Sequence, residues 1–118
     1  MQTSILLVED EALIRMMLAD MVAELGHRVA AEACDLKSGL ELAGTQQFDL
    51  AILDLKLESD SSEPIADVLA RRGIPFVFAS GYGASGLPEP HRHRPVLQKP
   101  FEMKQLETTI RALLDRAA

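Results

Sequence analysis

The stretch Ile5-Leu6-Leu7-Val8-Glu9-Asp10-Glu11 decides the fold, because four consecutive apolar residues stop abruptly at three acids. A run that is apolar on both faces is typical of a strand inside a parallel sheet that helices cover on both sides. Four further short runs, of which the first is the weakest, follow along the chain: Val29–Ala33, Leu50–Leu53, Pro75–Ala79 and Pro95–Gln98. The sequence therefore predicts five strands.

Amphipathic stretches separate these runs. Apolar residues at helical spacing predict four regular helices, marked by Leu13, Met16, Met17, Met21 and Leu25; by Leu36, Leu40 and Ala43; by Ile65, Val68 and Leu69; and by Met103, Leu106, Ile110, Leu113 and Leu114. Gly26 is placed to stop the first helix, and Ser61 or Ser62 to cap the third ahead of Pro64. Residues 81–95 are rich in Gly and Pro, so the helix expected there is short or irregular and more mobile than the rest.

The alternation of strands and helices predicts an α/β fold made of right-handed βαβ units. We expect one domain over residues 1–118, with a five-stranded parallel sheet and helices on both faces. A flavodoxin-like strand order, 2-1-3-4-5, is the commonest solution at this size. In such a sheet the C-terminal ends of the strands lie along one edge, and ligands bind where the strand order reverses.

The amino-acid composition argues against a membrane-spanning protein and against direct nucleic-acid binding. The chain is 47% hydrophobic and 25% charged, as expected for a soluble globular protein, and no apolar stretch approaches the ~20 residues that cross a bilayer. A net charge of −6 argues against direct nucleic-acid binding, and the basic cluster at 91–94 is expected to be a solvated loop. The single cysteine, Cys34, excludes an intramolecular disulfide, suits a cytoplasmic setting and is expected to be partly buried.

Polar residues end four of the five runs, and they suggest a phosphoryl site. Asp10 and Asp54 are predicted to face each other across the crevice between the first and third strands. At about 4 Å and an effective dielectric of about 20, their repulsion is about 4 kcal/mol, so one must be protonated or a cation must lie between them. A site with only two or three carboxylates as oxygen ligands suits Mg²⁺. Lys99 and Ser80 then supply a cation and a hydroxyl for a phosphoryl group.

The motifs also resemble a known family, the response-regulator receiver domain of two-component signalling. They are Leu7-Val8-Glu9-Asp10-Glu11, Leu53-Asp54-Leu55, Ser80-Gly81 and Lys99-Pro100-Phe101, in the family's order and spacing over the whole chain. The resemblance implies that Asp54 takes a phosphoryl group from a histidine kinase in a Mg²⁺-dependent reaction. The domain would catalyse only its own phosphorylation and dephosphorylation. It would signal by protein contact, by onward transfer to a phosphotransfer protein, or as a phosphate sink.

The resemblance assigns further roles residue by residue. It implies that Asp10 and the backbone carbonyl of Lys56 bind the metal beside the acceptor, with Glu9 as a more distant or water-mediated ligand. Lys99 and Ser80 would contact the phosphoryl group. It also implies a cis peptide between Lys99 and Pro100, which would turn Lys99 toward the acceptor.

Residues 75–83 resemble a subgroup called FAT GUY receivers, with Ser80 where threonine is usual. That subgroup implies alphaproteobacteria and a histidine kinase of the HWE type. Most receivers carry proline four residues after the acceptor and glycine four residues later, whereas this chain has Glu58 and Ser62. The acidic loop from Leu57 to Glu63 is therefore expected to be solvated and to differ in conformation.

The switch region is also unusual, because the position of the family's switch aromatic holds Val96. Valine has restricted rotamers and cannot report the state of Ser80 by swinging inward. We expect the segment 81–95, with Tyr82 as its large aromatic, to act as the bistable element instead.

Two other functions use related residues. A Mg²⁺-dependent phosphatase of the haloacid-dehalogenase type also has a strand-end aspartate nucleophile, but it requires a second acid where this chain has Lys56. A flavodoxin-like cofactor binder would need a loop rich in glycine and hydroxyls after the first strand, where this chain has three acids.

Overall fold

The sheet has the predicted order. A computed structural model describes residues 3–81 and 87–117 of the chain. Its five parallel strands, in spatial order β2-β1-β3-β6-β7, are Arg28–Ala33, Ser4–Val8, Leu50–Asp54, Phe76–Ser80 and Val96–Gln98. In order of appearance along the chain these are strands 2-1-3-4-5, which confirms the flavodoxin-like arrangement.

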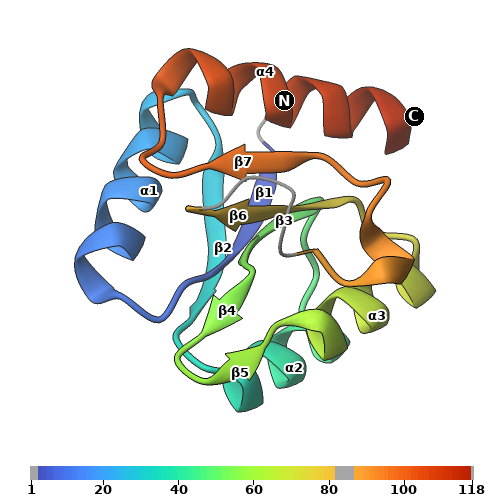
Figure 1. Ribbon diagram of the computed structural model, residues 1–118. Coiled ribbons are helices and arrows are strands. Elements are labelled where there is room, and N and C mark those ends of the chain that lie inside the picture. The colour runs from blue at the N-terminus through green and yellow to red at the C-terminus, as the bar shows by residue number, and fades with distance from the viewer. Residues whose placement is uncertain (1–2, 82–86, 118) are drawn as a thin grey trace.

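Two layers of helices cover the sheet (Figure 1). Helices α1 (Ala12–Glu24) and α4 (Met103–Ala117) lie on one face, and α2 (Leu36–Thr45) and α3 (Glu63–Arg72) lie on the other. Successive residues of a strand point to opposite faces, so β1 sends Ile5 and Leu7 toward α1 and α4, and Leu6 and Val8 toward α2 and α3. This explains why the strands are apolar on both faces.

Helix α1 buries only the C-terminal part of the predicted apolar stripe, where Met21 and Leu25 pack against the core. Leu18 and Val22 are its buried residues, whereas Leu13, Met16 and Met17 are 70%, 62% and 51% exposed. The helix is apolar almost all round, so spacing alone could not identify the side that meets the sheet. Gly26 ends this segment with a φ of +88°, a conformation that suits glycine.

The loop after β3 holds an element that the sequence did not predict. Strands β4 (Lys56–Leu57) and β5 (Asp60–Ser61) pair antiparallel in a small hairpin. Leu57 and Ser62 are buried, so within this acidic loop only the four residues between them are fully solvated. Ser62 precedes α3 but its hydroxyl donates to the carbonyl of Leu55, and the hydroxyl of Ser61 accepts from the first N–H of the helix.

The connection between β6 and β7 is irregular, as predicted. Within its described part, residues 81 and 87–95, the only helical turn is a 3-10 turn, η2 (Glu89–His91). Tyr82 lies outside the described residues. The peptide between Lys99 and Pro100 is cis, which confirms the prediction.

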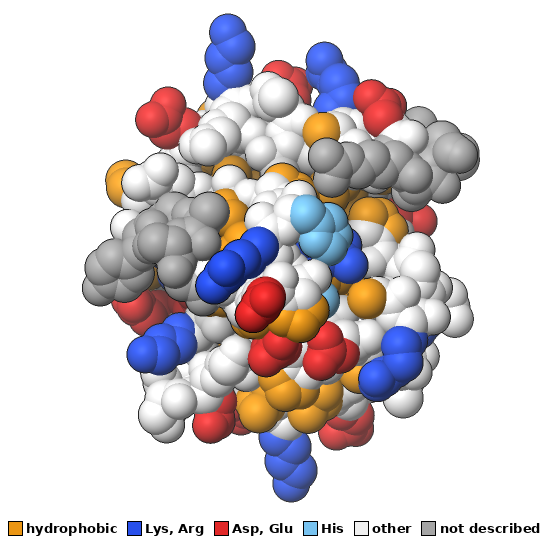
Figure 2. Space-filling view, turned by 45° about the vertical axis from the view of Figure 1, so that its right-hand side comes forward, with side chains coloured by type: hydrophobic (Ala, Val, Ile, Leu, Met, Phe, Trp, Pro, Cys, Tyr) orange, Lys and Arg blue, Asp and Glu red, His pale blue; other side chains and the backbone are white. Residues whose placement is uncertain are grey.

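The exposure of the single cysteine, Cys34, differs from the prediction. Cys34 is exposed rather than partly buried, because it lies just beyond the end of β2. On the face shown in Figure 2, Lys and Arg side chains are scattered among acidic ones and form no continuous patch. In the part of the chain that the structure describes, no helix is long and apolar enough to span a bilayer.

Candidate functional site

A pocket of about 430 Å³ lies at the C-terminal edge of the sheet. Loops that follow β1, β3, β6 and β7 form its walls, as expected for an open parallel sheet. Its lining residues are Asp10, Glu11, Asp54, Leu55, Lys56, Glu58, Ser61, Ser80, Gly81 and Lys99. The pocket therefore lies where the sequence placed the candidate chemistry.

Asp54 is the most perturbed carboxyl group of the pocket. It ends β3 and is only 8% exposed. Burial, together with the negative charge of Glu9, raises the pKa of Asp54 to about 7, although Lys99 opposes this shift. In the metal-free protein a neutral Asp54 is therefore well populated near neutral pH, which limits its repulsion with the other acids.

Lys99 joins two of the acids. Its Nζ lies 2.8 Å from Oε1 of Glu9 and 3.2 Å from Oδ1 of Asp54. Burial opposes the charged ammonium, but these two acids outweigh it and raise the pKa of Lys99. The other oxygen of Glu9 accepts the N–H of Glu11 at 3.1 Å, so both oxygens of this buried carboxylate have partners. Lys99 is thus a fixed positive charge beside Asp54.

Asp10 lies on the open side of the cluster. Its Oδ2 accepts the backbone N–H of Glu58 at 2.9 Å. Partial burial disfavours its ionisation, but hydrogen bonds with Asp54 and from Glu58 outweigh that effect and lower the pKa of Asp10. Glu9, Asp10 and Asp54 each offer an oxygen within 4.8 Å of the others. A group of hard oxygen ligands that repel one another fits Mg²⁺.

Of the remaining predicted residues that the structure describes, Ser80 and Lys56 line the same pocket and Val96 does not. Ser80 ends β6, is buried, and its carbonyl accepts the N–H of Lys99. Lys56 begins β4 and lines the pocket. Val96 lies further back, opposite Phe78 in the sheet and packed against the core.

Two contributors were missed by the sequence reasoning. Arg15 of α1 donates to the carbonyl of Glu9 at 2.8 Å and pairs with Glu32, which fixes the turn that presents the acids. No sequence signal distinguishes it from other surface arginines. Glu58, in contrast, carried a signal, because it replaces the proline that the receiver pattern has at this position.

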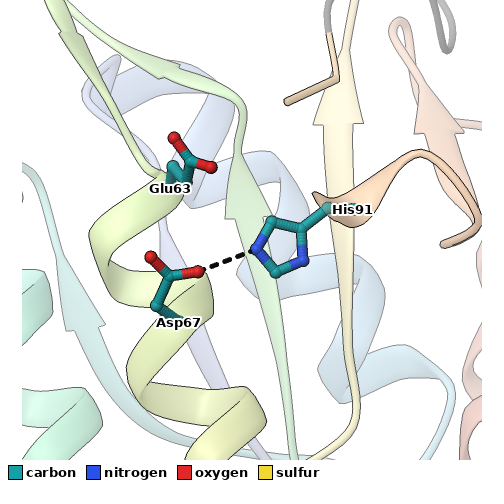
Figure 3. Close-up of side chains that lie close together, drawn as sticks. All are labelled: Glu63, Asp67 and His91. Atoms are coloured by element: carbon teal, nitrogen blue, oxygen red, sulfur yellow. Dashed lines mark hydrogen bonds and ion pairs between the residues drawn. The ribbon is translucent and has the colours of Figure 1, made fainter. Parts of the chain in front are cut away.

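A second group of possible metal ligands lies away from the pocket (Figure 3). Glu63 and Asp67 of α3 point toward His91 of η2, whose Nε2 lies 3.0 Å from Oδ1 of Asp67. Nδ1 of His91 accepts from Nε of Arg94 at 3.0 Å. With both ring nitrogens engaged, Nε2 carries the proton that it donates to Asp67. This arrangement fits a hydrogen-bonded anchor between η2 and α3 rather than a metal site.

The basic cluster at 91–94 is therefore only partly a solvated loop, and that prediction was wrong for two of its residues. His91 is 4% exposed and contacts the rings of Phe76 and Phe78 edge-on. The guanidinium of Arg94 lies 4.2 Å from the ring centre of Phe76. Arg92 and His93 are exposed, as expected.

Comparison with known proteins identifies one family. The model of the response regulator receiver domain matches residues 5–111. The transcriptional regulatory protein PdtaR of Mycobacterium tuberculosis is 34% identical over 116 residues, which cover 95% of this chain and 57% of that protein. The two-component response regulator PhoP of Pseudomonas aeruginosa is 32% identical over 125 residues, covering 97% of this chain and 52% of PhoP. The chain thus spans a little over half the length of these relatives.

Solved structures agree with this result. The solution structure of SdrG from Sphingomonas melonis Fr1 has 41% identity and a TM-score of 0.83, and the match covers 96% of this chain and 97% of SdrG. The receiver domain of the response regulator PhyR from Erythrobacter litoralis has 31% identity and a TM-score of 0.78, with 97% and 91% covered.

Proposed function

Because the chain belongs to the response regulator receiver family, we propose that it accepts a phosphoryl group from a histidine kinase on Asp54. The observation that carries this proposal is the position of Asp54, a buried carboxyl at a strand end, between Lys99 and two further acids. Phosphoryl transfer needs positioning and charge neutralisation more than covalent chemistry, and this arrangement supplies both.

The transfer itself is simple. One carboxylate oxygen of Asp54 forms a bond to phosphorus while the P–N bond of the donor's phosphohistidine breaks. The donor nitrogen keeps the electron pair and is protonated by water. Lys99 is close enough to Asp54 to stabilise charge on the phosphoryl oxygens, and Ser80 lines the same pocket and offers its hydroxyl. Neutral Asp54 must first lose its proton, since only the carboxylate is a nucleophile.

Mg²⁺ is the proposed cofactor. Asp10, Asp54 and the backbone carbonyl of Lys56 are the proposed ligands, and all three residues line the pocket. Glu9 is assigned a water-mediated role, because Lys99 and the N–H of Glu11 already engage its two oxygens. The cation supplies positive charge that neutralises the acids and the transferred group. Its binding favours the ionised form of Asp54, which links metal affinity to the pH.

The output is proposed to be protein contact, onward transfer to a phosphotransfer protein, or action as a phosphate sink. The description of one structural relative bears on the choice among these three outputs. That relative is described as the anti-anti-sigma factor PhyR from Bartonella quintana, with 27% identity over 98% of this chain. A histidine kinase of the HWE type and a cytoplasmic location belong to the same proposal.

Intact-mass measurement tests the proposal. Acetyl phosphate or phosphoramidate with Mg²⁺ should add one phosphoryl group to the chain and none to Asp54→Asn. Beryllofluoride, which mimics an acyl phosphate, should bind only when Mg²⁺ and Asp54 are both present. A haloacid-dehalogenase-type phosphatase would instead turn over small phosphate esters. Equal labelling of the parent and Asp54→Asn would contradict the assignment.

A further inference from the structure

Glu58 has a backbone conformation that side chains disfavour. Its φ is +58°, and it is the one non-glycine residue with positive φ in the described part of the chain. It occupies the first central position of the two-residue turn between β4 and β5, because Leu57 pairs with Asp60. Hairpin turns with positive φ at that position prefer glycine. Strained residues cluster at functional sites, so the φ of Glu58 suggests that this turn has a role in the neighbouring pocket.

The turn holds the N–H of Glu58 against Asp10. The distance from this nitrogen to Oδ2 of Asp10 is 2.9 Å, across 48 positions of sequence. The loop that carries it is anchored at several points. Leu57 is buried in the core, and Ser62 donates both its N–H and its hydroxyl to the carbonyl of Leu55, closing the base of the hairpin. The N–H is thus part of a fixed structure.

Besides this donor, Asp10 hydrogen-bonds with the side chains of Asp54 and Glu9, but those bonds need a proton that is lost when the acids are ionised. Lys99 pairs with Glu9 and with Asp54. None of the ion pairs between described residues includes Asp10. The carboxylate of Asp10 is less buried than those of Glu9 and Asp54, and it lies close enough for their negative charges to repel it. Without a donor, rotation of the Asp10 side chain away from the pocket would relieve that repulsion at little cost.

We propose that the main-chain N–H of Glu58 is a positioning group for Mg²⁺ binding, because it fixes one oxygen of Asp10 and leaves the other available to the cation. This inference rests on the proposed function of the pocket. Groups that orient a metal ligand through a hydrogen bond typically change metal affinity by about 10- to 100-fold. The residue with the strained φ lies in the same turn that carries this N–H to Asp10.

Variants at position 58 separate the N–H from the side chain. Glu58→Gln and Glu58→Gly keep the N–H, and glycine also relieves the strained φ. Glu58→Pro removes the N–H, but it also forces a negative φ. Replacement of the amide at position 58 by an ester, with the Glu side chain retained, removes the N–H alone. Each variant of the full chain is titrated with Mg²⁺ by calorimetry, and its thermal unfolding is measured without metal.

The inference predicts the order of Mg²⁺ affinities among these variants. The Gln and Gly variants should bind Mg²⁺ about as tightly as the parent, and Glu58→Gly should unfold at a higher temperature. The ester should bind at least about tenfold more weakly while remaining folded. In NMR spectra of the apo protein, the amide proton of residue 58 should be protected from exchange in the parent and in Glu58→Gly, and unprotected in Asp10→Ala.

Contrary results are equally clear. An ester that binds Mg²⁺ as tightly as the parent overturns the inference, and so does a Gly variant that binds as weakly as the ester. If either occurs while the parent still binds Mg²⁺ and is phosphorylated on Asp54, only the positioning role fails. If the parent neither binds Mg²⁺ nor accepts a phosphoryl group, the proposed function fails with it.

Discussion

Asp54 combines two requirements that conflict in the metal-free protein. The proposed transfer step requires a buried Asp54, because burial excludes water, yet Asp54 lies close to Glu9 and Asp10, which carry charge of the same sign. Lys99 compensates only part of this repulsion, because it also pairs with Glu9 at the shorter distance of 2.8 Å. The raised pKa of Asp54 is the consequence.

Stability without metal should therefore depend on pH. The pKa of Asp54 is about 7 in the folded protein and about 3.9 in an unfolded chain. The folded state holds the extra proton, so this group's contribution to the free energy of unfolding is complete below pH ~4 and lost as the pH rises through ~7. This difference in pKa corresponds to at most about 4 kcal/mol.

Urea unfolding at pH 5 and pH 8 without divalent ions checks this expectation. Asp54→Asn should lack the decline and should be more stable than the parent at pH 8. Glu9, Asp10 and Lys99 face the group and stay in both proteins, so their contributions cancel to first order. Parallel pH dependences for the two proteins would show that Asp54 is ionised in the folded apo state.

Lys99 should matter for stability as well as for transfer. Lys99→Met keeps the apolar stem but leaves Glu9 buried without its cation. Removing one partner of a buried pair costs about 3 kcal/mol or more. The double variant with Glu9→Gln should recover part of this loss, because the orphaned charge is gone. Chemical unfolding of the parent, both single variants and the double variant measures the coupling; additive effects would refute it.

At the scale of elements, α1 presents an apolar surface that the fold does not use. Leu13, Met16 and Met17 are exposed on the helix that begins directly after the acids, and Glu11 lines the pocket. In the proposed reaction, a protein donor that brings phosphohistidine to Asp54 must cover this edge. Exposed methionine and leucine adapt to a partner's side chains at low cost.

Met16→Glu is therefore expected to lower kcat/KM for phosphoryl transfer from the cognate kinase by about tenfold, or 1.4 kcal/mol, with labelling by acetyl phosphate unchanged. Gln105→Glu, an exposed position on α4, adds the same charge away from the pocket and serves as the control. Equal loss with the kinase and with acetyl phosphate would indicate a damaged pocket instead of a lost contact.

The anchor between η2 and α3 makes a separate prediction. His91→Ala leaves a cavity beside Phe76 and Phe78 and removes the donor to Asp67. Loss of both should lower the free energy of unfolding by about 2–4 kcal/mol. His93→Ala, at an exposed position two residues away, should change it by less than about 0.5 kcal/mol. Equal effects of the two substitutions would argue against the anchor.

Sequence reasoning succeeded where a feature depends on neighbouring residues. The buried strands are continuous apolar runs, and the acids at their ends follow from the parallel topology. It failed where a feature depends on distant partners. The burial of His91 requires Asp67, 24 positions away, and the turn of the β4–β5 hairpin contacts Asp10, 48 positions from Glu58. In α1, the excess of apolar residues hid the buried face.

For the whole molecule, the question is how the state of Asp54 reaches a distant surface. The strands offer a direct route, because β3, β6 and β7 are neighbours and Ser80 lies opposite Gln98. The carbonyl of Ser80 also accepts the N–H of Lys99. A shift of Ser80 toward a phosphoryl group would therefore act on both ends of the segment 81–95. Val96, in contrast, is a partly buried core residue with few rotamers to exchange.

The segment 81–95 remains the predicted bistable element, and its described part adds a constraint. Leu87 and His91 are buried, so residues 87–95 are attached to the core through the His91 anchor. Hydrogen exchange is the suitable measurement, because it reports local opening along the chain. Mg²⁺ with beryllofluoride should change protection within residues 81–95 of the parent and leave Asp54→Asn unchanged. His91→Ala should weaken protection there before any ligand is added. If saturation of Asp54 leaves protection in this segment unaltered, the signal is carried by the added charge at the pocket alone.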